Sequence, residues 1–175
     1  MGWNERMRDA ADPGGLAGWT GRVAGYLPGG DQFRAWSVTE WARFGGQPKL
    51  PIFVRTAPAH PEDDAFSVLR SLHFLGVPAG RGVWTALDLE TVQAPGYVAA
   101  YGQALHWAGF KVAVYGSAST VFGNPPLDGY WVADYAGIGP FMFDDPEAVM
   151  TQYASGASFD SSTVRIAVQA DRWWV

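Results

Sequence analysis

The sequence predicts an α/β fold, a TIM-like β/α barrel. Strand-like segments alternate with helix-like segments at spacings of roughly 20 to 30 residues, which is the pattern of right-handed βαβ units in a parallel sheet. The clearest strand covers residues 83–90, V-W-T-A-L-D-L-E, where an apolar run leads into Asp88 and Glu90. Such a run is typical of a parallel strand covered on both faces. This alternation also fits an open doubly wound sheet, and the polar residues at the strand ends favour the barrel.

Each further element follows from a local pattern. Strands are predicted at 22–27, 49–55, 111–115, 130–135 and 150–153, with a last extended segment near Phe159 and Asp160. Helices are predicted at 37–44, 61–75, 95–108 and 117–122, with a helical turn over 145–149. Ser37 and Glu40 form a capping-box pattern, and Pro61 and Pro95 stand where prolines begin helices. Residues 1–21 are polar and Gly-rich, so an irregular N-terminal arm is predicted there, and the barrel domain is assigned to 22–175.

Composition narrows the possible functions. The 175 residues suffice for one domain, and the absence of cysteine excludes disulfides and thiolate metal sites. Three separated histidines offer no metal-ligand spacing, so neither a metal nor another cofactor is expected. The net charge is −5 with scattered basic residues, which argues against a nucleic-acid partner. No apolar run approaches the ~20 residues of a membrane span, and no signal peptide is present, so localisation stays open.

Polar side chains end most of the predicted strands, and in a barrel such ends converge on one bowl. They are Arg55, Asp88 with Glu90, Tyr115, Asp134 with Tyr135, Gln152 with Tyr153, and Asp160. On an extended strand, Asp88 and Glu90 would share a face about 6.6 Å apart and could address one substrate. An alternative is that these acids only cap the following helix. Contributions from six strands favour a polar pocket of carbohydrate size.

Four strand-end motifs resemble a known family. They are A-L-D-L-E (86–90), V-Y-G-S (114–117), W-V-A-D-Y (131–135), and T-Q-Y-A-S-G with F-D-S-S (151–162). In this order they resemble the β/α-barrel lysozymes of glycoside hydrolase family 25. They are closer still to the related glycoside-hydrolase-like domain of unknown function, family 1906, of actinobacteria and their phages. The resemblance implies that peptidoglycan glycan is the partner and substrate, cut at the muramic acid linkage.

The resemblance also implies roles for individual residues. Glu90 matches the general acid, Asp88 the neighbouring carboxylate, and Asp160 the acid near the final strand. The sugar-binding residues that it implies are Trp131, Tyr135, Gln152 and Tyr153. A glycosidase needs one protonated carboxyl and a second charge that steadies an oxocarbenium-like transition state. Asp88 could instead orient a substrate acetamido group, and the residues leave both mechanisms open.

Two departures from the family pattern support an alternative function. The family's first strand ends in an Asp, whereas Asp9 and Asp12 fall in the predicted arm, so the barrel is expected to be incomplete at its first unit. Arg55 also places a cation at a strand end, where it would contact the glycan or form an ion pair with Asp88 or Glu90. The alternative is a non-catalytic domain that binds glycan or belongs to a larger assembly such as a phage virion. The tail Trp173-Trp174 either folds back on the core or docks on another subunit, which could serve self-assembly or virion assembly.

Overall fold

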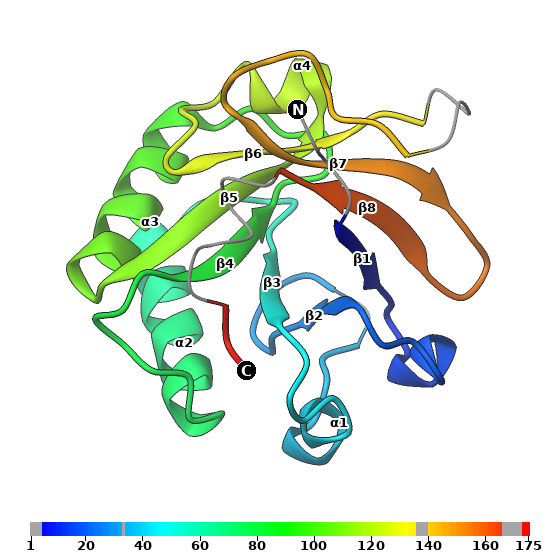
Figure 1. Ribbon diagram of the computed structural model, residues 1–175. Helices are drawn as coiled ribbons and strands as arrows, with labels where there is room; N and C mark the ends of the chain where they lie inside the picture. Colours follow the sequence, from blue (N-terminus) through cyan, green and yellow to red (C-terminus); the bar gives the residue numbers. More distant parts are fainter. Residues whose placement is uncertain (1–4, 33, 136–139, 166–172) are drawn as a thin grey trace.

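The computed structural model describes residues 5–32, 34–135, 140–165 and 173–175. Its strands form one closed barrel in which spatial order follows sequence order (Figure 1). Neighbouring strands from the first to the seventh are parallel, so the predicted β/α barrel is confirmed. The strands are β1 Glu5–Asp9, β2 Arg22–Tyr26, β3 Lys49–Val54, β4 Val83–Asp88, β5 Phe110–Ser117, β6 Gly129–Ala133, β7 Ala148–Ser155 and β8 Asp160–Val164.

The first strand corrects the prediction of an irregular arm and an incomplete barrel. β1 pairs in parallel with β2 and antiparallel with β8, so the barrel begins at Glu5 rather than at Arg22. Its sequence, E-R-M-R-D, contains one apolar residue, Met7, which is fully buried inside the barrel. On the outer side, the guanidinium of Arg8 lies 4.2 Å from the ring centroid of Trp19 and 4.0 Å from that of Phe159. Aromatic rings from distant parts of the sequence thus cover the outer face of β1, which has no apolar residue of its own.

The last strand corrects the expectation of an all-parallel sheet. β8 is antiparallel to both of its neighbours, β7 and β1. Only residues 156–159 separate β7 from β8, and a connection this short makes a hairpin rather than a parallel crossover. The start of β8 therefore lies at the same end of the barrel as the carboxyl ends of the other strands. Asp160 reaches that end although it begins its strand.

The helices of the described residues lie close to their predicted positions except for η1, which falls in the segment predicted to be an irregular arm. They are η1 Pro13–Leu16, α1 Val38–Ala42, α2 Pro61–Phe74, α3 Pro95–Trp107 and α4 Ala118–Val121. The capping box of Ser37 and Glu40 is formed, and α2 and α3 begin with proline as predicted. The predicted helical turn over 145–149 is wrong, because residues 146–147 form a turn and β7 begins at Ala148. No helix in the described ranges is long and apolar enough to cross a membrane.

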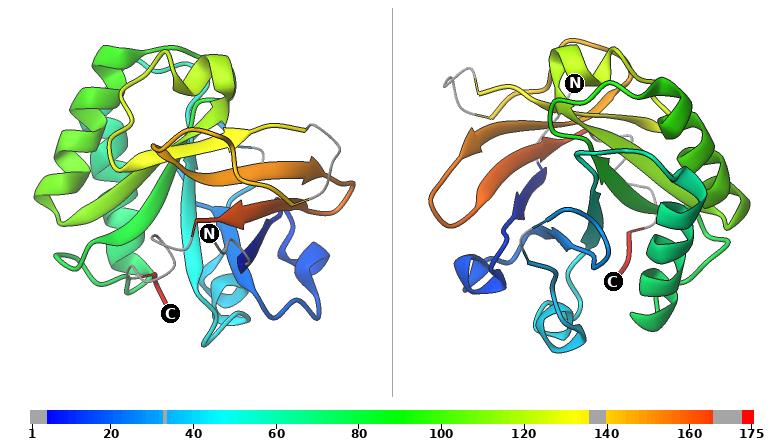
Figure 2. Two further views of the ribbon diagram at one scale, coloured as in Figure 1. Left: turned by 45° about the horizontal axis from the view of Figure 1, so that its top comes forward. Right: turned by 180° about the vertical axis from the view of Figure 1, so that it is seen from behind.

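The apolar core has two main layers. One lies inside the barrel and includes Met7, Trp84, Met150 and Trp173. The other lies between the barrel and the helices α2 and α3, which run side by side over one flank (Figure 1, Figure 2). Because both layers are filled by side chains, the barrel has a solid interior and can bind a ligand only at its ends.

The carboxyl-terminal tail closes one end of the barrel. Trp173 is buried with the interior residues, and the backbone N–H of Lys49 donates to the carbonyl of Trp174 at 2.7 Å. The ring of Trp174 also packs 5.1 Å from that of Trp41. Of the two alternatives for this tail, the structure therefore has it folded back on the core. Lys49 begins β3, so the closed end is the amino-terminal end of the strands and the opposite end is left as the mouth.

Candidate active site

Strand alternation brings polar side chains from several strands into the mouth. Residues two apart on a strand point to the same face. Asp9 follows the interior residue Met7 by two positions, Asp88 follows Ala86, and Gln152 follows Met150. All three side chains are at least 95% buried. By the same alternation, Tyr26 and Tyr115 stand two positions after Ala24 and Ala113, so a polar layer lies above the apolar interior.

Asp9 is the principal residue that the sequence-based prediction missed. It ends β1, is 4% exposed, and pairs in the strand register with Asp160 of β8. Burial raises the pKa of Asp9 to about 8, and the charge of Asp160 adds to the rise. The hydroxyl of Tyr26 donates to Asp9 Oδ2 at 3.4 Å and opposes this rise. The only local signal was an Asp two residues after a lone apolar Met, which is too weak to define a strand.

Asp88 lies in the mouth as predicted and is 5% exposed. Burial raises its pKa to about 8, with further contributions from the charges of Glu90 and Asp9. A hydrogen bond of 2.8 Å from the backbone N–H of Glu90 to Asp88 Oδ1 opposes the rise. The acids of β1, the β4 end and β8 are therefore electrostatically coupled. At neutral pH, Asp9 and Asp88 are held mainly as neutral carboxyls, which can donate hydrogen bonds.

Glu90 lies just beyond the end of its strand. β4 ends at Asp88, so the two-residue alternation does not extend to Glu90, and its φ is +55°. Its side chain is exposed, whereas Leu89 between the two acids is fully buried. The hydrogen bond from the Glu90 backbone means that Asp88 caps the turn at residues 88–90, but the acids do not cap the following helix, because α3 begins after Ala94 with no side-chain cap. Capping and a place in the mouth are combined in one carboxyl group.

Aromatic side chains line the same end. The indole Nε1 of Trp131 donates to Ser162 Oγ at 3.1 Å, and the ring of Tyr115 meets Trp131 edge-on with 4.8 Å between centroids. The hydroxyls of Tyr115 and Tyr135 lie 3.5 Å apart, and Tyr135 is 55% exposed. Burial raises the pKa of Tyr26 and of Tyr115, and the nearby aspartates raise both further. These phenols therefore stay neutral and can donate hydrogen bonds to a ligand.

Two buried polar atoms in this layer lack a hydrogen-bond partner within the described part of the chain. They are Asp9 Oδ1 and Gln152 Nε2. An unsatisfied buried polar group costs about 1–3 kcal/mol, and native proteins leave few of them. One atom belongs to a carboxyl group and the other is an amide donor, so a ligand that both donates and accepts hydrogen bonds would satisfy the pair.

Other predicted site residues are placed differently. The guanidinium of Arg55 pairs with Asp31 and Asp64, and no ion pair with Asp88 or Glu90 is found among the described residues. Tyr153 is half-buried and is the extra residue of a β-bulge between Gln152 and Ala154, so strand alternation does not place its side chain with that of Gln152 in the mouth. Asp134 lies one residue beyond β6, half-buried, and its backbone N–H donates to the Gln152 carbonyl at 2.9 Å. Within the described ranges, no group of three or more acids or histidines could hold a metal ion.

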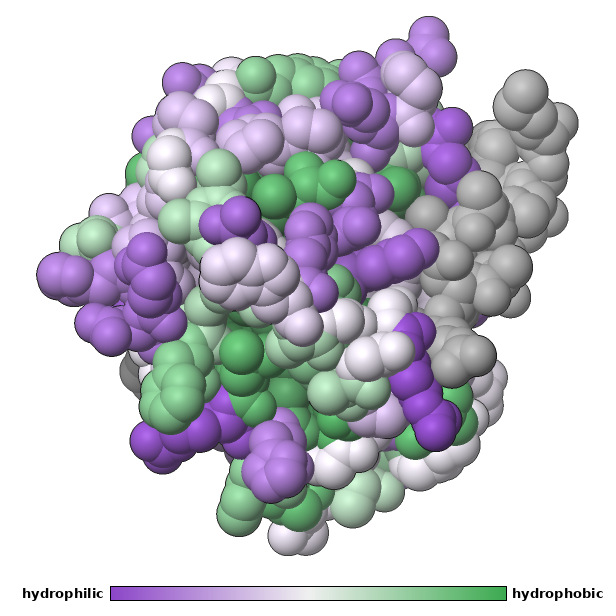
Figure 3. Space-filling model, turned by 90° about the vertical axis from the view of Figure 1, so that its left-hand side faces the viewer, coloured by the Kyte–Doolittle hydropathy of each residue, from purple (hydrophilic) through white to green (hydrophobic). Residues whose placement is uncertain are grey.

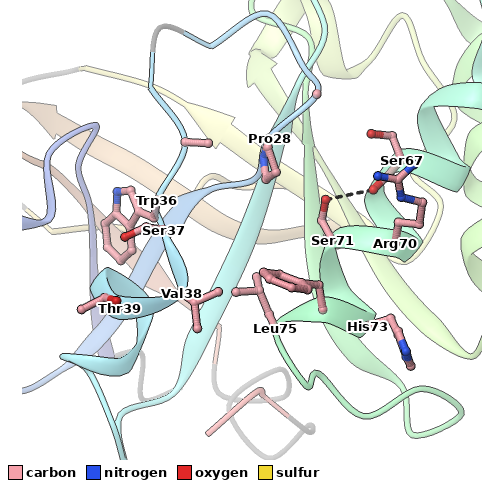
Figure 4. Close-up of a pocket in the computed structure, with 13 residues that line it drawn as sticks. Pro28, Trp36, Ser37, Val38, Thr39, Ser67, Arg70, Ser71, His73 and Leu75 are labelled. Atoms are coloured by element: carbon pink, nitrogen blue, oxygen red, sulfur yellow. Dashed lines mark hydrogen bonds between the residues drawn. The ribbon is translucent and has the colours of Figure 1, made fainter.

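A hollow of the described surface lies elsewhere. It measures about 1040 Å³ and runs along the barrel flank between the β2–α1 connection and α2 (Figure 4). Trp36, Val38, Phe74 and Leu75 give it apolar walls, and none of the mouth acids lines it. The helical face around α2 and α3 shows apolar side chains gathered in its lower half (Figure 3). This flank is separate from the acid cluster, and the chemistry of the mouth carries the functional assignment.

Comparison with solved structures supports the same architecture. No protein-family model matches the chain, and no curated protein matches its sequence. An uncharacterized B. stearothermophilus protein matches with a TM-score of 0.73 and 15% identity, over 94% of this chain and 98% of that one. Streptococcus pneumoniae GHIP, a glycosyl hydrolase 25, matches with a TM-score of 0.63 and 12% identity, over 94% and 88%.

A third neighbour is larger than the present chain. The modular autolysin LytC from Streptococcus pneumoniae, in complex with a synthetic peptidoglycan ligand, matches with a TM-score of 0.68 and 16% identity. The match covers 92% of this chain but 46% of LytC, so the chain spans about half the length of that protein. At these identities, the likeness establishes the barrel fold that this chain shares with the three proteins.

Proposed function

We propose that the mouth of the barrel binds the glycan of peptidoglycan and hydrolyses it by acid–base catalysis. One observation carries this proposal: acids from β1, the β4 end and β8 converge on one mouth, where burial raises the pKa of two of them to about 8. Glycoside hydrolysis needs a protonated carboxyl next to a carboxylate, and closely placed acids push pKa values apart. The structural likeness to LytC and GHIP supports this substrate class. Assignment to the family 1906 type of actinobacteria and phages rests on the strand-end motifs alone.

Each acid has a role in this proposal. Glu90 is the exposed acid of the group and donates a proton to the leaving glycosidic oxygen; this role rests on its match to the D-x-E motif, since the raised pKa values belong to Asp9 and Asp88. Asp160 supplies the second acid, which stabilises the oxocarbenium-like charge. Asp88, neutral and buried, donates a hydrogen bond to the bound sugar, in the way that a protonated aspartic acid can act as a donor. Asp9 pairs in the strand register with Asp160 and interacts electrostatically with Asp88, so its protonation state affects the charge of the whole cluster.

The remaining mouth residues bind the sugar in this proposal. Tyr135 and Tyr115 present ring faces and hydroxyls, and Trp131 forms the floor. Gln152 Nε2 and Asp9 Oδ1 gain partners from the polar substituents of the sugar, which offsets the cost of their burial. Arg55, Asp134 and Tyr153 lie outside the group of side chains that this proposal uses.

The alternative role as a non-catalytic glycan-binding or virion component loses three of its supports. The first-strand acid that seemed missing corresponds to Asp9 at the end of β1. Arg55 is engaged by Asp31 and Asp64, so its positive charge is balanced outside the acid cluster. The folded-back tail also removes the exposed Trp-Trp end that suggested docking.

The test compares the purified wild type with Glu90→Gln on suspensions of bacterial cell wall. Loss of turbidity and release of reducing ends are followed together, because reducing ends report cleavage of a glycosidic bond. Removal of a general acid typically costs 10²- to 10⁴-fold in rate, so we expect Glu90→Gln to lose at least about 100-fold. Glu62→Gln, the same substitution at an exposed position of α2, is the matched control and should act like the wild type. A wild type that releases no reducing ends at any pH would remove the catalytic proposal.

A further inference from the structure

Arg55 is the centre of a polar network beside the mouth. Its Nε donates to Asp64 Oδ2 at 2.9 Å, and a second bond runs from its Nη2 to Asp64 Oδ1. Its Nη1 donates to Asp31 Oδ1 at 2.7 Å, and Nη2 also reaches the carbonyl of Gly29 at 3.2 Å. Each of the three guanidinium nitrogens therefore donates to an acceptor from the helix α2 or from the β2–α1 connection.

Asp31 ties two loops of the mouth to each other. Its Oδ2 accepts the backbone N–H of Thr56 at 2.7 Å, the hydroxyl of Thr56 at 3.1 Å and the backbone N–H of Ala57 at 3.3 Å. Burial opposes ionisation of Asp31, but the Thr56 hydrogen bonds and the charge of Arg55 outweigh it and lower the pKa of Asp31. One carboxylate therefore bridges the β2–α1 connection, in which it lies, and the β3–α2 connection that contains Thr56.

Asp64 anchors the other side of the network. It lies in the first turn of α2, is 7% exposed, and accepts the hydroxyl of Tyr97 from α3 at 2.8 Å. A buried carboxylate is tolerated when its oxygens are hydrogen-bonded and its charge is paired, and both conditions hold here. Through Asp64, the position of the Arg55 guanidinium is fixed relative to the two long helices.

The network also touches the strand that carries Asp88. The backbone N–H of Arg55 donates to the carbonyl of Asp88 at 2.8 Å, and Val54 pairs with Asp88 in the register of β3 and β4. The connections after β2 and β3 both leave the carboxyl ends of their strands, so they form one wall of the mouth. Arg55 therefore links this wall to the strand end from which Asp88 and Glu90 project.

We propose that Arg55 is a positioning residue for the mouth and does not contact the glycan. It orders residues 28–31 and 55–57 as one wall of the substrate cleft and fixes the end of β4. This inference rests on the proposed function of the same mouth. Lysine cannot take the place of arginine here, because an ammonium is a point charge and cannot bridge two carboxylates and a carbonyl in one plane.

The test uses Arg55→Lys, Asp31→Asn and the double variant, with Arg70→Lys as the matched control. Arg70 is an exposed arginine of α2 that forms no ion pair within the described residues. Misplaced substrate-binding groups can cost up to about 10²-fold, so we expect each single variant to raise KM about tenfold and to lower kcat by a smaller factor, because the β4 end that carries Glu90 loosens as well, with the pH optimum nearly unchanged. The double variant should be no worse than the worse single variant, because both substitutions break one network. Arg70→Lys should match the wild type.

Hydrogen exchange supplies a readout that does not depend on activity. The backbone N–H groups of Thr56 and Glu90 should exchange faster in Arg55→Lys and Asp31→Asn, because their hydrogen bonds to Asp31 and Asp88 depend on the network. If the wild type proves inactive, the proposed function fails. Faster exchange at Thr56 and Glu90 would then still support a positioning role, and unchanged exchange would overturn it.

Two combinations of results would overturn the inference. If Arg55→Lys raises KM while Asp31→Asn does not, Arg55 contacts the glycan directly. If both variants lower the melting temperature but leave KM and exchange at Glu90 unchanged, the network only stabilises the fold. A parallel rise in KM with faster exchange in both variants is the result that we expect.

Discussion

Replacement of Asp9 by asparagine should stabilise the protein at neutral and alkaline pH. Asparagine resembles the neutral form of the buried carboxyl, and its amide oxygen can still accept the Tyr26 hydroxyl. The pKa of Asp9 is raised from 3.8 to about 8 in the folded protein. Between these values, the unfolded chain releases a proton that the folded chain keeps, so stability falls as the pH rises through this window and is constant above it.

The magnitude follows from the size of the shift. A rise of about four pKa units, at about 1.4 kcal/mol per unit, corresponds to about 6 kcal/mol lost between pH 4 and pH 8 as an upper limit. Asp88 has a pKa raised to the same range and interacts with Asp9, so the two share part of this cost. For a domain of this size, 1 kcal/mol moves Tm by about 2–4 °C. We therefore expect Asp9→Asn to melt about 5–10 °C above the wild type at pH 8 and close to it at pH 4.

The assay is thermal unfolding followed by circular dichroism from pH 4 to pH 9. The quantity of interest is the difference in Tm between wild type and variant at each pH, which cancels the contribution of carboxylates that do not interact with Asp9. Asp144→Asn, at an exposed position before β7, serves as the control and should give a flat difference. If the difference for Asp9→Asn does not grow between pH 5 and pH 8, Asp9 is not held neutral in the folded protein.

Two further predictions concern the backbone. Glu90 has a φ of +55°, a conformation that costs a non-glycine residue about 1–2 kcal/mol. Glu90→Gly should therefore raise the free energy of unfolding by about 1 kcal/mol relative to Glu90→Ala while removing activity; equal stability of the two variants in urea unfolding would contradict this. Gly25→Ala should lower stability by about 1–3 kcal/mol, because a Cβ there would lie 2.5 Å from the buried ring of Trp36. Gly96→Ala, with open space around its Cβ, should be neutral or slightly stabilising, and a large loss there would contradict the packing.

The sequence was most informative where local patterns determine structure. β4 was predicted because its residues are apolar on both faces, and all six residues from Val83 to Asp88 are buried. The helix α2 was predicted from a proline followed by acids at its start, and the helix α3 from a proline followed by regularly spaced apolar residues. These features depend on neighbours a few residues away, so they are visible without the fold.

The missed features depend on contacts between distant residues. β1 is held by pairing with β2 and β8, and its Arg8 is covered by Trp19 and Phe159, so its own residues do not indicate a strand. The predicted ion-pair partners of Arg55 were wrong because the sequence contains many carboxylates that could pair with a guanidinium. Asp31 and Asp64 become neighbours only once the barrel has closed.

The two ends of the barrel differ in their titratable groups, because the buried acids of raised pKa lie at the mouth. At the amino-terminal end, Trp173 is buried, and the Lys49 ammonium donates to the Gln47 carbonyl at 3.1 Å and lies over the ring of Trp174. At the mouth, Asp9 Oδ1 and Gln152 Nε2 are buried without partners in the described ranges, and Glu90 has an unfavourable φ. Selection for stability alone would remove such features, because neutral or apolar substitutes are readily found. Buried polar atoms without partners in the described ranges also occur at the amino-terminal end, in Trp41 and Gln47, so the raised pKa values of Asp9 and Asp88 are what support placing the function of the chain at the mouth.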